Sequence, residues 1–251
     1  MVNRLATEKR ALILQLLTEG MGVTATTRIV GCSKNTVLKL LRDAGQACAA
    51  YQDENLRNLE CRRIQADEIW SFVYAKKTTR TSTPDAGDVW TWVAICEDTK
   101  LVPAWWIGDR SYETGILFME DLAARMSNPI QLTTDGLTTY LDAVNDAFSD
   151  WMVEHRVLNR HYPDAKVGRT AYIEGQNLTM RMSMRRYQRT TDAHSKKLVN
   201  HAHAVALNCM VYNFVGVHQS LPGRVAPAMA AGVTSRIWTF ADIVRLVDGS
   251  N

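Results

Sequence analysis

The spacing of apolar residues changes once along the chain, near residue 64, and this change restricts the folds open to it. Before that point apolar residues recur every three or four positions, which is typical of amphipathic helices. After it, three segments rich in aromatic and β-branched residues indicate strands: QADEIWSFVYA from residue 65, DVWTWVAICED from residue 88 and LVPAWWIGD from residue 101. We predict that these strands form an antiparallel meander.

Beyond the third strand, helical and strand-like segments alternate. The pattern predicts a helix over 112–126, a strand over 130–136, a helix over 137–148 and a strand over 151–159. Further helices are predicted over 171–189, 195–215 and 240–247. Strands that first form hairpins and then alternate with helices indicate a mixed sheet flanked by helices, in the α+β or α/β class.

The first 45 residues have the pattern of a small helical domain. Helices are predicted over 4–18 and 25–30, and a third follows the turn Gly31-Cys32-Ser33 and stops at Gly45. Two helices joined by a short glycine-containing turn describe a helix-turn-helix, the second helix of which reads DNA. Its outward residues would be Lys34, Asn35, Lys39 and Arg42. The alternative is a three-helix packing module with a solvated polar face.

Charge is distributed unevenly along the 251 residues, although the net charge is only +3. Residues 1–63 hold 10 Lys and Arg against 6 Asp and Glu, residues 64–159 hold 7 against 15, and residues 160–200 hold 9 against 3. The acidic segment is either an ordinary acidic surface or a carboxylate site flanked by surfaces that bind a polyanion.

Other features of the composition exclude several classes of protein. The five cysteines form no CxxC pair, so neither a disulfide framework nor a cysteine-based zinc site is indicated. No long uncharged apolar run predicts a membrane span, and the charged N-terminus does not resemble a signal peptide. We expect a cytoplasmic protein that associates with the nucleoid.

Three acidic residues have positions that suggest chemistry. Asp67 lies inside an apolar strand, where an unpaired carboxylate is costly. Asp135 ends the strand before Gly136 and could instead cap a helix, while Glu174 lies in the first turn of a helix, where the helix dipole alone would stabilise it. Together the three carboxylates are hard oxygen ligands suited to Mg²⁺ or Mn²⁺.

The predicted helix over 171–189 carries a second signal. At 100° per residue, three arginines fall within about 60° of the Glu174 direction: Arg181, Arg185 and Arg189. One helix would then present a metal ligand together with groups that bind DNA phosphates. A solvated basic face is the alternative.

Several long blocks of the sequence resemble the insertion-sequence-one family of DDE transposases. They are QADEIWSF, LTTDGLTTY, AYIEGQNLTMRMSMRRYQR, HSKKLVNHAHAVALNCMVYNFVGVHQSL and APAMAAGVTSRIWT, and with them the resemblance covers nearly the entire chain. It implies a ribonuclease-H-like catalytic core, which we assign to residues 64–190, and a metal-binding catalytic triad of Asp67, Asp135 and Glu174. The chain departs from some members of this family in having no cysteine-based zinc finger.

The resemblance also implies an activity and partners. The activity would be Mg²⁺-dependent cleavage at the ends of an insertion element, followed by transfer of the 3′-OH strand into target DNA. The partner would be double-stranded DNA, and we expect a homo-oligomer to act on it. We expect a helix-turn-helix domain over 1–45, a helical or extended linker over 46–63 and a helical extension of the core over 191–251.

Two other functions remain open at this point. A catalytically silent DNA-binding regulator would need the N-terminal helices and not the three carboxylates. A stand-alone ribonuclease-H-like nuclease would need the carboxylates and not the N-terminal helices.

Overall fold

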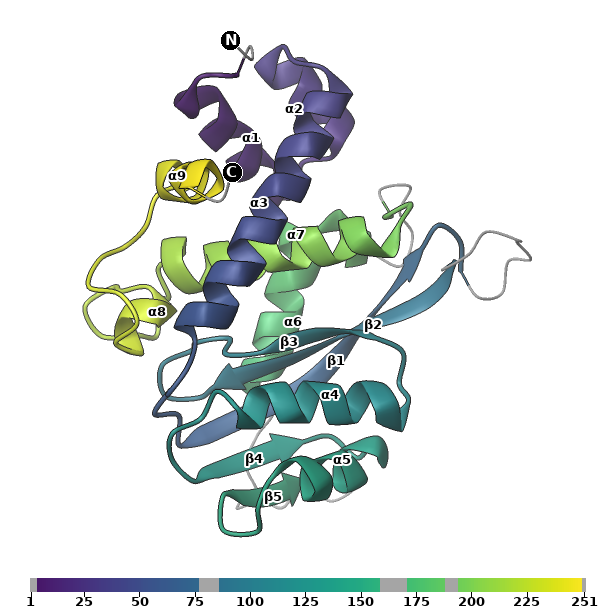
Figure 1. Ribbon diagram of the computed structural model, residues 1–251, viewed down its shortest axis with the longest axis vertical. Helices are drawn as coiled ribbons and strands as arrows, with labels where there is room; N and C mark the ends of the chain where they lie inside the picture. The colour runs from purple at the N-terminus through teal and green to yellow at the C-terminus, as the bar shows by residue number, and fades with distance from the viewer. Residues whose placement is uncertain (1–3, 77–85, 159–170, 188–193, 250–251) are drawn as a thin grey trace.

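The computed structural model describes residues 4–76, 86–158, 171–187 and 194–249, and in these ranges the strands form one mixed sheet (Figure 1). The strand order is β3-β2-β1-β4-β5. Their bounds are β1 Arg63–Val73, β2 Gly87–Cys96, β3 Trp105–Gly108, β4 Ile130–Thr134 and β5 Val153–Val157. β1, β2 and β3 pair antiparallel, as the predicted meander requires, whereas β4 pairs parallel to both β1 and β5.

The central strand β1 is covered on both faces, so its side chains are buried in both directions. On one face, the Gln65 side chain accepts hydrogen bonds from the backbone N–H groups of Tyr172 and Ile173 at 3.1 and 2.9 Å. These are N–H groups of the first turn of a helix, which lack partners within the helix. On the same face, the Ser71 hydroxyl donates to the carbonyl of Arg186 at 2.8 Å. Gln65 and Ser71 thus attach the next helical layer to β1.

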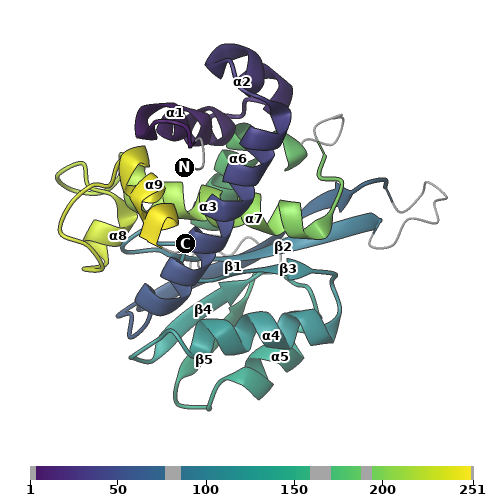
Figure 2. The same cartoon turned by 45° about the horizontal axis from the view of Figure 1, so that its top comes forward.

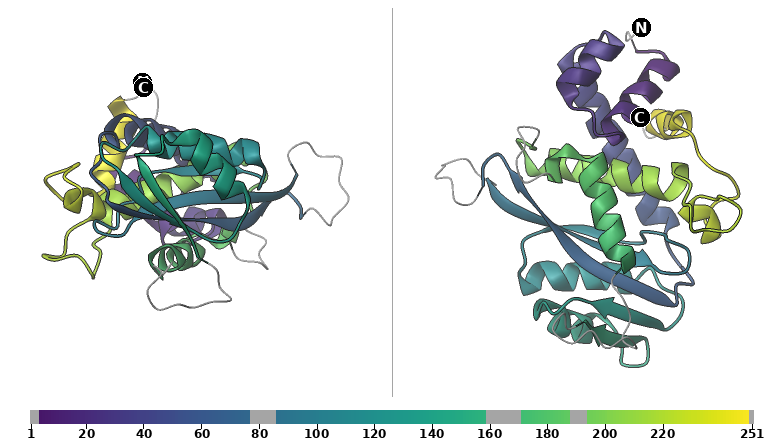
Figure 3. Two further views of the ribbon diagram at one scale, coloured as in Figure 1. Left: turned by 90° about the horizontal axis from the view of Figure 1, so that it is seen from below. Right: turned by 180° about the vertical axis from the view of Figure 1, so that it is seen from behind.

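Helices therefore flank both faces of the sheet. α4 (Tyr112–Ala123) and α5 (Thr139–Ala147) lie on one face, and α6 (Ala171–Ser183) lies on the other (Figures 1 and 3). In the layer beneath α4 and α5, the Trp92 ring contacts the rings of Phe118 and Tyr140. This mixed α/β architecture is compatible with the predicted ribonuclease-H-like fold.

The helix predicted over 171–189 is shorter than expected. α6 ends at Ser183, and the chain continues into a 3₁₀ turn over Arg185–Tyr187. The change in direction lets Tyr187 enter the core, where its hydroxyl lies 2.7 Å from that of Thr91. The constant 100° rotation that aligned the arginines with Glu174 therefore holds only as far as Arg181.

Three helices precede the sheet: α1 (Thr7–Thr18), α2 (Val23–Val30) and α3 (Lys34–Asn55). Ser33 caps α3, because its hydroxyl accepts a hydrogen bond from the backbone N–H of Thr36 at 3.1 Å. The predicted stop at Gly45 is wrong, since α3 continues for ten more residues and contains the first part of the expected linker.

A glycine is needed at position 45 because two helices cross there. α7 (Leu198–Met210) passes α3 so closely that a Cβ atom at Gly45 would lie 2.4 Å from Cβ of His203 and 2.5 Å from its Cα and carbonyl oxygen. Only glycine leaves room for such an approach.

The rest of the chain returns to the N-terminal helices. A π-helical turn over Val211–Val215 extends α7, α8 spans Pro227–Ala230 and α9 spans Phe240–Gly249. α9 packs against α1 and α3 (Figure 2), and Arg10 of α1 pairs with Asp248 of α9 at 2.6 Å. The two ends of the chain thus support each other. Among the described helices, none has the length and apolarity that crossing a membrane requires.

Candidate functional site

The site lies where β4 stops and β1 continues. The last pair between these parallel strands joins Ala66 to Thr134. The next residues, Asp67 on β1 and Asp135 beyond β4, follow that pair directly. Because β4 no longer covers this edge of β1, the side chains there have space to converge.

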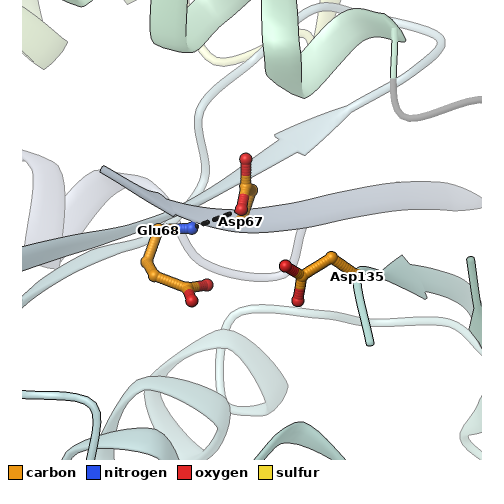
Figure 4. A group of neighbouring side chains, drawn as sticks. All are labelled: Asp67, Glu68 and Asp135. Carbon is orange, nitrogen blue, oxygen red and sulfur yellow. Dashed lines mark hydrogen bonds between the residues drawn. The ribbon is translucent and has the colours of Figure 1, made fainter. Parts of the chain in front are cut away.

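Three carboxylates meet in this space: Asp67, Glu68 and Asp135, here called the carboxylate group. One oxygen from each lies within 4.8 Å of the others, and each residue taken as a whole, backbone included, is partly exposed. Figure 4 shows the Asp135 side chain pointing toward the two residues of β1. The structure thus brings together two of the three predicted acidic residues, although 68 residues separate them.

Hydrogen bonds hold the two aspartates in place. The Asp67 carboxylate accepts from the backbone N–H of Glu68 at 2.9 Å and from the side-chain amide of Asn177 on α6 at 2.8 Å. Asp135 accepts from the backbone N–H of Leu137 at 3.0 Å, which closes a turn. Asp135 is not the N-cap of α5, because that helix begins two residues after Leu137 and its N-cap position is Thr138.

Glu68 is the member of the group that the sequence analysis missed. Its side chain is only 2% exposed, receives a hydrogen bond from the Tyr140 hydroxyl at 3.0 Å and pairs with Arg110. Burial and the nearby Asp135 charge raise the pKa of Glu68 to about 7, although Arg110 opposes the rise. Burial also raises the pKa of Tyr140, so its hydroxyl stays a donor to Glu68.

The three carboxylates fit a hard divalent cation. Mg²⁺ holds its oxygen ligands at about 2.0–2.1 Å, so two ligands on opposite sides of one ion lie about 4.2 Å apart. The three carboxylate oxygens lie up to 4.8 Å from one another, which is close to this value. A cation would also offset the repulsion that contributes to the raised pKa of Glu68.

Glu174 does not belong to the carboxylate group in this structure. It is exposed on α6, three residues before Asn177, which is the residue of α6 that reaches Asp67. Asn177 is 3% exposed, and its side-chain oxygen has no hydrogen-bond partner. The sequence contained one signal for Asn177, namely a polar residue one turn after a candidate ligand on the same helix.

The candidate DNA-binding residues of α3 face solvent. Lys34, Asn35, Lys39 and Arg42 are all exposed. Lys39 and Arg42 both contact Asp43, which lies one turn after Lys39. Two of the four side chains therefore have an acidic partner that a phosphate would have to replace.

The basic residues near the end of α6 are placed differently from the prediction. Arg181 and Arg185 are exposed, Arg185 lies in the 3₁₀ turn, and Arg189 lies outside the described residues. A Cβ atom at Gly22, between α1 and α2, would lie 3.9 Å from the Arg185 guanidinium. The end of α6 is thus beside the N-terminal helices.

Comparisons with known proteins place the chain in no family. No protein-family model and no curated protein matches it. Among solved structures it matches a chain of a simian T-cell lymphotropic virus intasome in complex with PP2A regulatory subunit B56 gamma. The identity is 15% and the TM-score 0.48, over 88% of this chain and 74% of that chain. Since so distant a likeness shows no function, the resemblance to insertion-sequence-one transposases stays a prediction.

Proposed function

We propose that this chain is a DDE transposase that cleaves DNA at the ends of an insertion element and transfers the freed 3′-OH strand to target DNA. The observation that carries this proposal is the convergence of Asp67, Glu68 and Asp135 beside the end of β4. Three carboxylates held this close favour a site for Mg²⁺ or Mn²⁺. Such ions activate the attacking hydroxyl and stabilise the leaving oxygen in phosphoryl transfer.

Each residue of the site has its own part in this proposal. Asp67 and Asp135 would hold the metal through oxygens whose positions are set by Asn177 and by the turn at Leu137. Glu68 supplies a third carboxylate that Arg110 and Tyr140 orient. Glu174 remains a proposed ligand from α6, since it lies one helical turn from the residue that already contacts Asp67.

DNA recognition is assigned to the N-terminal helices. α2 and α3 are joined by the turn Gly31-Cys32-Ser33, in which Gly31 has a left-handed φ of 68°, and we propose that the pair acts as a helix-turn-helix. The exposed Asn35 and Lys34 at the start of α3 would contact base edges. Arg181 and Arg185 would bind phosphates of the same DNA, because the end of α6 lies beside α1 and α2.

Substitution of the aspartates tests the catalytic part of the proposal. Asp67→Asn and Asp135→Asn should each abolish Mg²⁺-dependent nicking of DNA that carries the element ends, and should leave gel-shift affinity for that DNA nearly unchanged. Asp150→Asn is the control, because Asp150 is exposed and lies outside the group. Equal loss of binding and nicking would mean that the aspartates are structural.

A second experiment tests recognition. Asn35→Ala should reduce the ratio of affinities for element ends and scrambled duplexes, since base contacts carry sequence information. Arg185→Ala should weaken both affinities and lower the salt slope by about 1, as expected for one lost phosphate contact. An unchanged ratio in Asn35→Ala would exclude reading by α3 and leave the catalytic proposal intact.

Strand transfer separates the proposal from its main alternative. A stand-alone nuclease could use the same carboxylates, so nicking alone does not distinguish the two activities. Incubation with element ends that already carry a free 3′-OH, together with a target plasmid, should yield joined products. Nicking without any joined product would support the nuclease instead.

A further inference from the structure

Two apolar side chains of α6, Leu178 and Met182, project into solvent. Met182 is 72% exposed and Leu178 is 55% exposed. Among the described residues, Trp151 is the only other large apolar side chain at least as exposed as Leu178. Leu178 and Met182 lie one helical turn apart and are therefore neighbours on the helix surface, here called the apolar pair. Neighbouring apolar side chains form a patch that a binding partner can cover.

The apolar pair flanks the face of α6 that is proposed to bind metal and phosphate. Leu178 directly follows Asn177, whose amide donates to the Asp67 carboxylate at 2.8 Å. At 100° per residue, Leu178 lies about 40° and Met182 about 80° round the helix from Glu174. Along the helix axis Met182 lies only about 8 Å beyond Asn177, at a rise of about 1.5 Å per residue. DNA held beside the carboxylate group would therefore lie against the apolar pair.

Positive charge adjoins the apolar pair. Arg181 lies between Leu178 and Met182 in sequence, Arg185 follows them in the 3₁₀ turn, and both arginines are exposed. Among the described residues, neither arginine has a carboxylate partner. Guanidinium groups without such a partner bind phosphates well. This charge complementarity favours DNA as the partner that covers the apolar pair.

The end of α6 is supported by the N-terminal helices (Figure 3). A Cβ atom at Gly20, in the turn between α1 and α2, would lie 3.2 Å from the carbonyl oxygen of Met182 and 3.6 Å from that of Ser183. The contact is made by backbone atoms on the α6 side. Met182 thus projects from a part of the helix that is held firmly in place.

Apolar side chains gain little from the outside of an intact duplex. Phosphates and sugars form its outer surface, the grooves expose mainly the polar edges of the bases, and stacking covers the apolar faces of the bases. Proteins that bend DNA reach those faces by inserting leucine, methionine and similar side chains between neighbouring base pairs. The apolar pair would gain most from DNA in which one base step is opened.

We infer that the apolar pair inserts between two neighbouring base pairs of the bound DNA and unstacks them close to the cleaved phosphate. The inference rests on the proposed function and adds the deformation of the DNA. Arg181 and Arg185 would hold phosphates beside the opened step. The distance of about 8 Å from Asn177 to Met182 corresponds to roughly two base pairs at about 3.4 Å each, so the opened step should lie within a few base pairs of the cleaved phosphate.

Fluorescence of 2-aminopurine tests the inference, because stacking quenches this adenine analogue. Duplexes with the element end would carry the analogue at successive positions on both sides of the cleaved phosphate. They would be titrated with protein in the absence of divalent metal, so that the DNA stays intact. With the wild-type protein the fluorescence should rise at neighbouring positions close to that phosphate. No rise at any position would overturn the inference.

Alanine substitution assigns the rise to the apolar pair. The double variant Leu178→Ala and Met182→Ala should lose the rise and should melt at the temperature of the wild type or higher, because both side chains are exposed and alanine favours a helix. Leu141→Ala is the matched control, since Leu141 is exposed on α5, on the opposite face of the sheet, and it should keep the rise. An undiminished rise in the double variant would overturn the inference.

Side-chain polarity provides a readout that a merely structural residue would not change. Met182→Leu should keep the rise, because leucine also inserts between bases. Met182→Gln should lose most of it, since glutamine is about as long as methionine but has a polar amide. Equal rises in these two variants would overturn the inference.

Affinity gives an independent measure of the unstacking. A mismatched pair at the opened step already weakens stacking, so the wild type should bind the mismatched duplex about tenfold more tightly than the paired one, a factor of about 1.4 kcal/mol. The double alanine variant should bind both duplexes with nearly equal affinity. Equal binding of both duplexes by the wild type would contradict insertion.

The outcomes also separate this inference from the proposed function. A wild type that causes no rise in fluorescence but nicks DNA in a way that depends on Asp67 would overturn the inference alone. Absence of both binding and nicking would overturn the two together. Loss of a dimer in the double alanine variant, with the rise in fluorescence unchanged, would mean that a second copy of the chain covers the apolar pair, and would also overturn the inference.

Discussion

Substitution of Gly45 by alanine tests the crossing of α3 and α7, which joins the N-terminal helices to the rest of the protein. An added Cβ atom would lie 2.4–2.5 Å from three atoms of His203, two of which belong to the backbone of α7. Carbon atoms pack at about 3.5–4.0 Å, so the helices would have to separate by roughly 1 Å. We therefore expect the substitution to destabilise the fold.

The magnitude follows from two opposing effects. Overpacking in a tight core costs about 1–3 kcal/mol, and the upper part of this range applies because backbone atoms form the obstacle. Alanine gains about 1 kcal/mol over glycine from helix propensity. The net loss in the free energy of unfolding is about 2 kcal/mol, or a melting temperature lowered by roughly 4–8 °C for a chain of this size.

Gly175 provides the matched control. It also lies inside a helix, α6, but a Cβ atom there would have no neighbour within 4 Å. Gly175→Ala should therefore raise the free energy of unfolding by about 0.5–1 kcal/mol. Both variants would be melted by circular dichroism beside the wild type. Stabilisation by Gly45→Ala comparable to that by Gly175→Ala would refute the close crossing.

Three further predictions concern buried polar groups. Glu68 has a pKa of about 7 in the folded protein against 4.5 ordinarily, so the free energy of unfolding of the metal-free protein should fall by up to about 3 kcal/mol as pH rises from about 4.5 to 7. Urea titrations at several pH values should show that Glu68→Gln flattens this dependence. Asn177→Leu should weaken Mn²⁺ binding in calorimetry at least several-fold, because leucine cannot donate the hydrogen bond that orients the Asp67 carboxylate, and unchanged binding would exclude a positioning role for the amide. Arg125→Met should lower the free energy of unfolding by about 3–5 kcal/mol, because Arg125 is buried and holds Asp121 and the carbonyls of Gln52 and Leu56; a loss below about 1 kcal/mol would contradict this.

The arrangement of strands and helices could be predicted because it depends on local patterns. Runs of aromatic and β-branched residues became β1 and β2, and the alternation after residue 111 became α4, β4, α5 and β5 in that order. A mixed sheet follows from such an order, since hairpins make antiparallel pairs and a connecting helix makes a parallel pair.

The carboxylate group was predictable only in part. Asp67 and Asp135 stood out because each interrupts or ends an apolar strand. Glu68 did not, because neighbouring residues of a strand point to opposite faces and Glu68 should have faced away from Asp67. The two do lie on opposite faces, Asp67 bonded to Asn177 of α6 and Glu68 to Tyr140 of α5. Asp135 reaches both because β4 ends at Thr134 and leaves the edge of β1 open, a fact of register that no local pattern contains.

The sequence by itself thus determined the order and type of the elements and two of the acidic residues that meet. Only the tertiary structure decided where helices end and which polar groups meet. The local preference of Gly45 indicated a helix end, yet in the fold Gly45 lies in the middle of α3, where α3 contacts α7. The physical reason for Gly45 is that local propensities are worth about 1 kcal/mol or less per residue, and contacts between distant segments exceed them. For Glu68 the reason is that its nearness to Asp135 depends on where β4 ends beside β1.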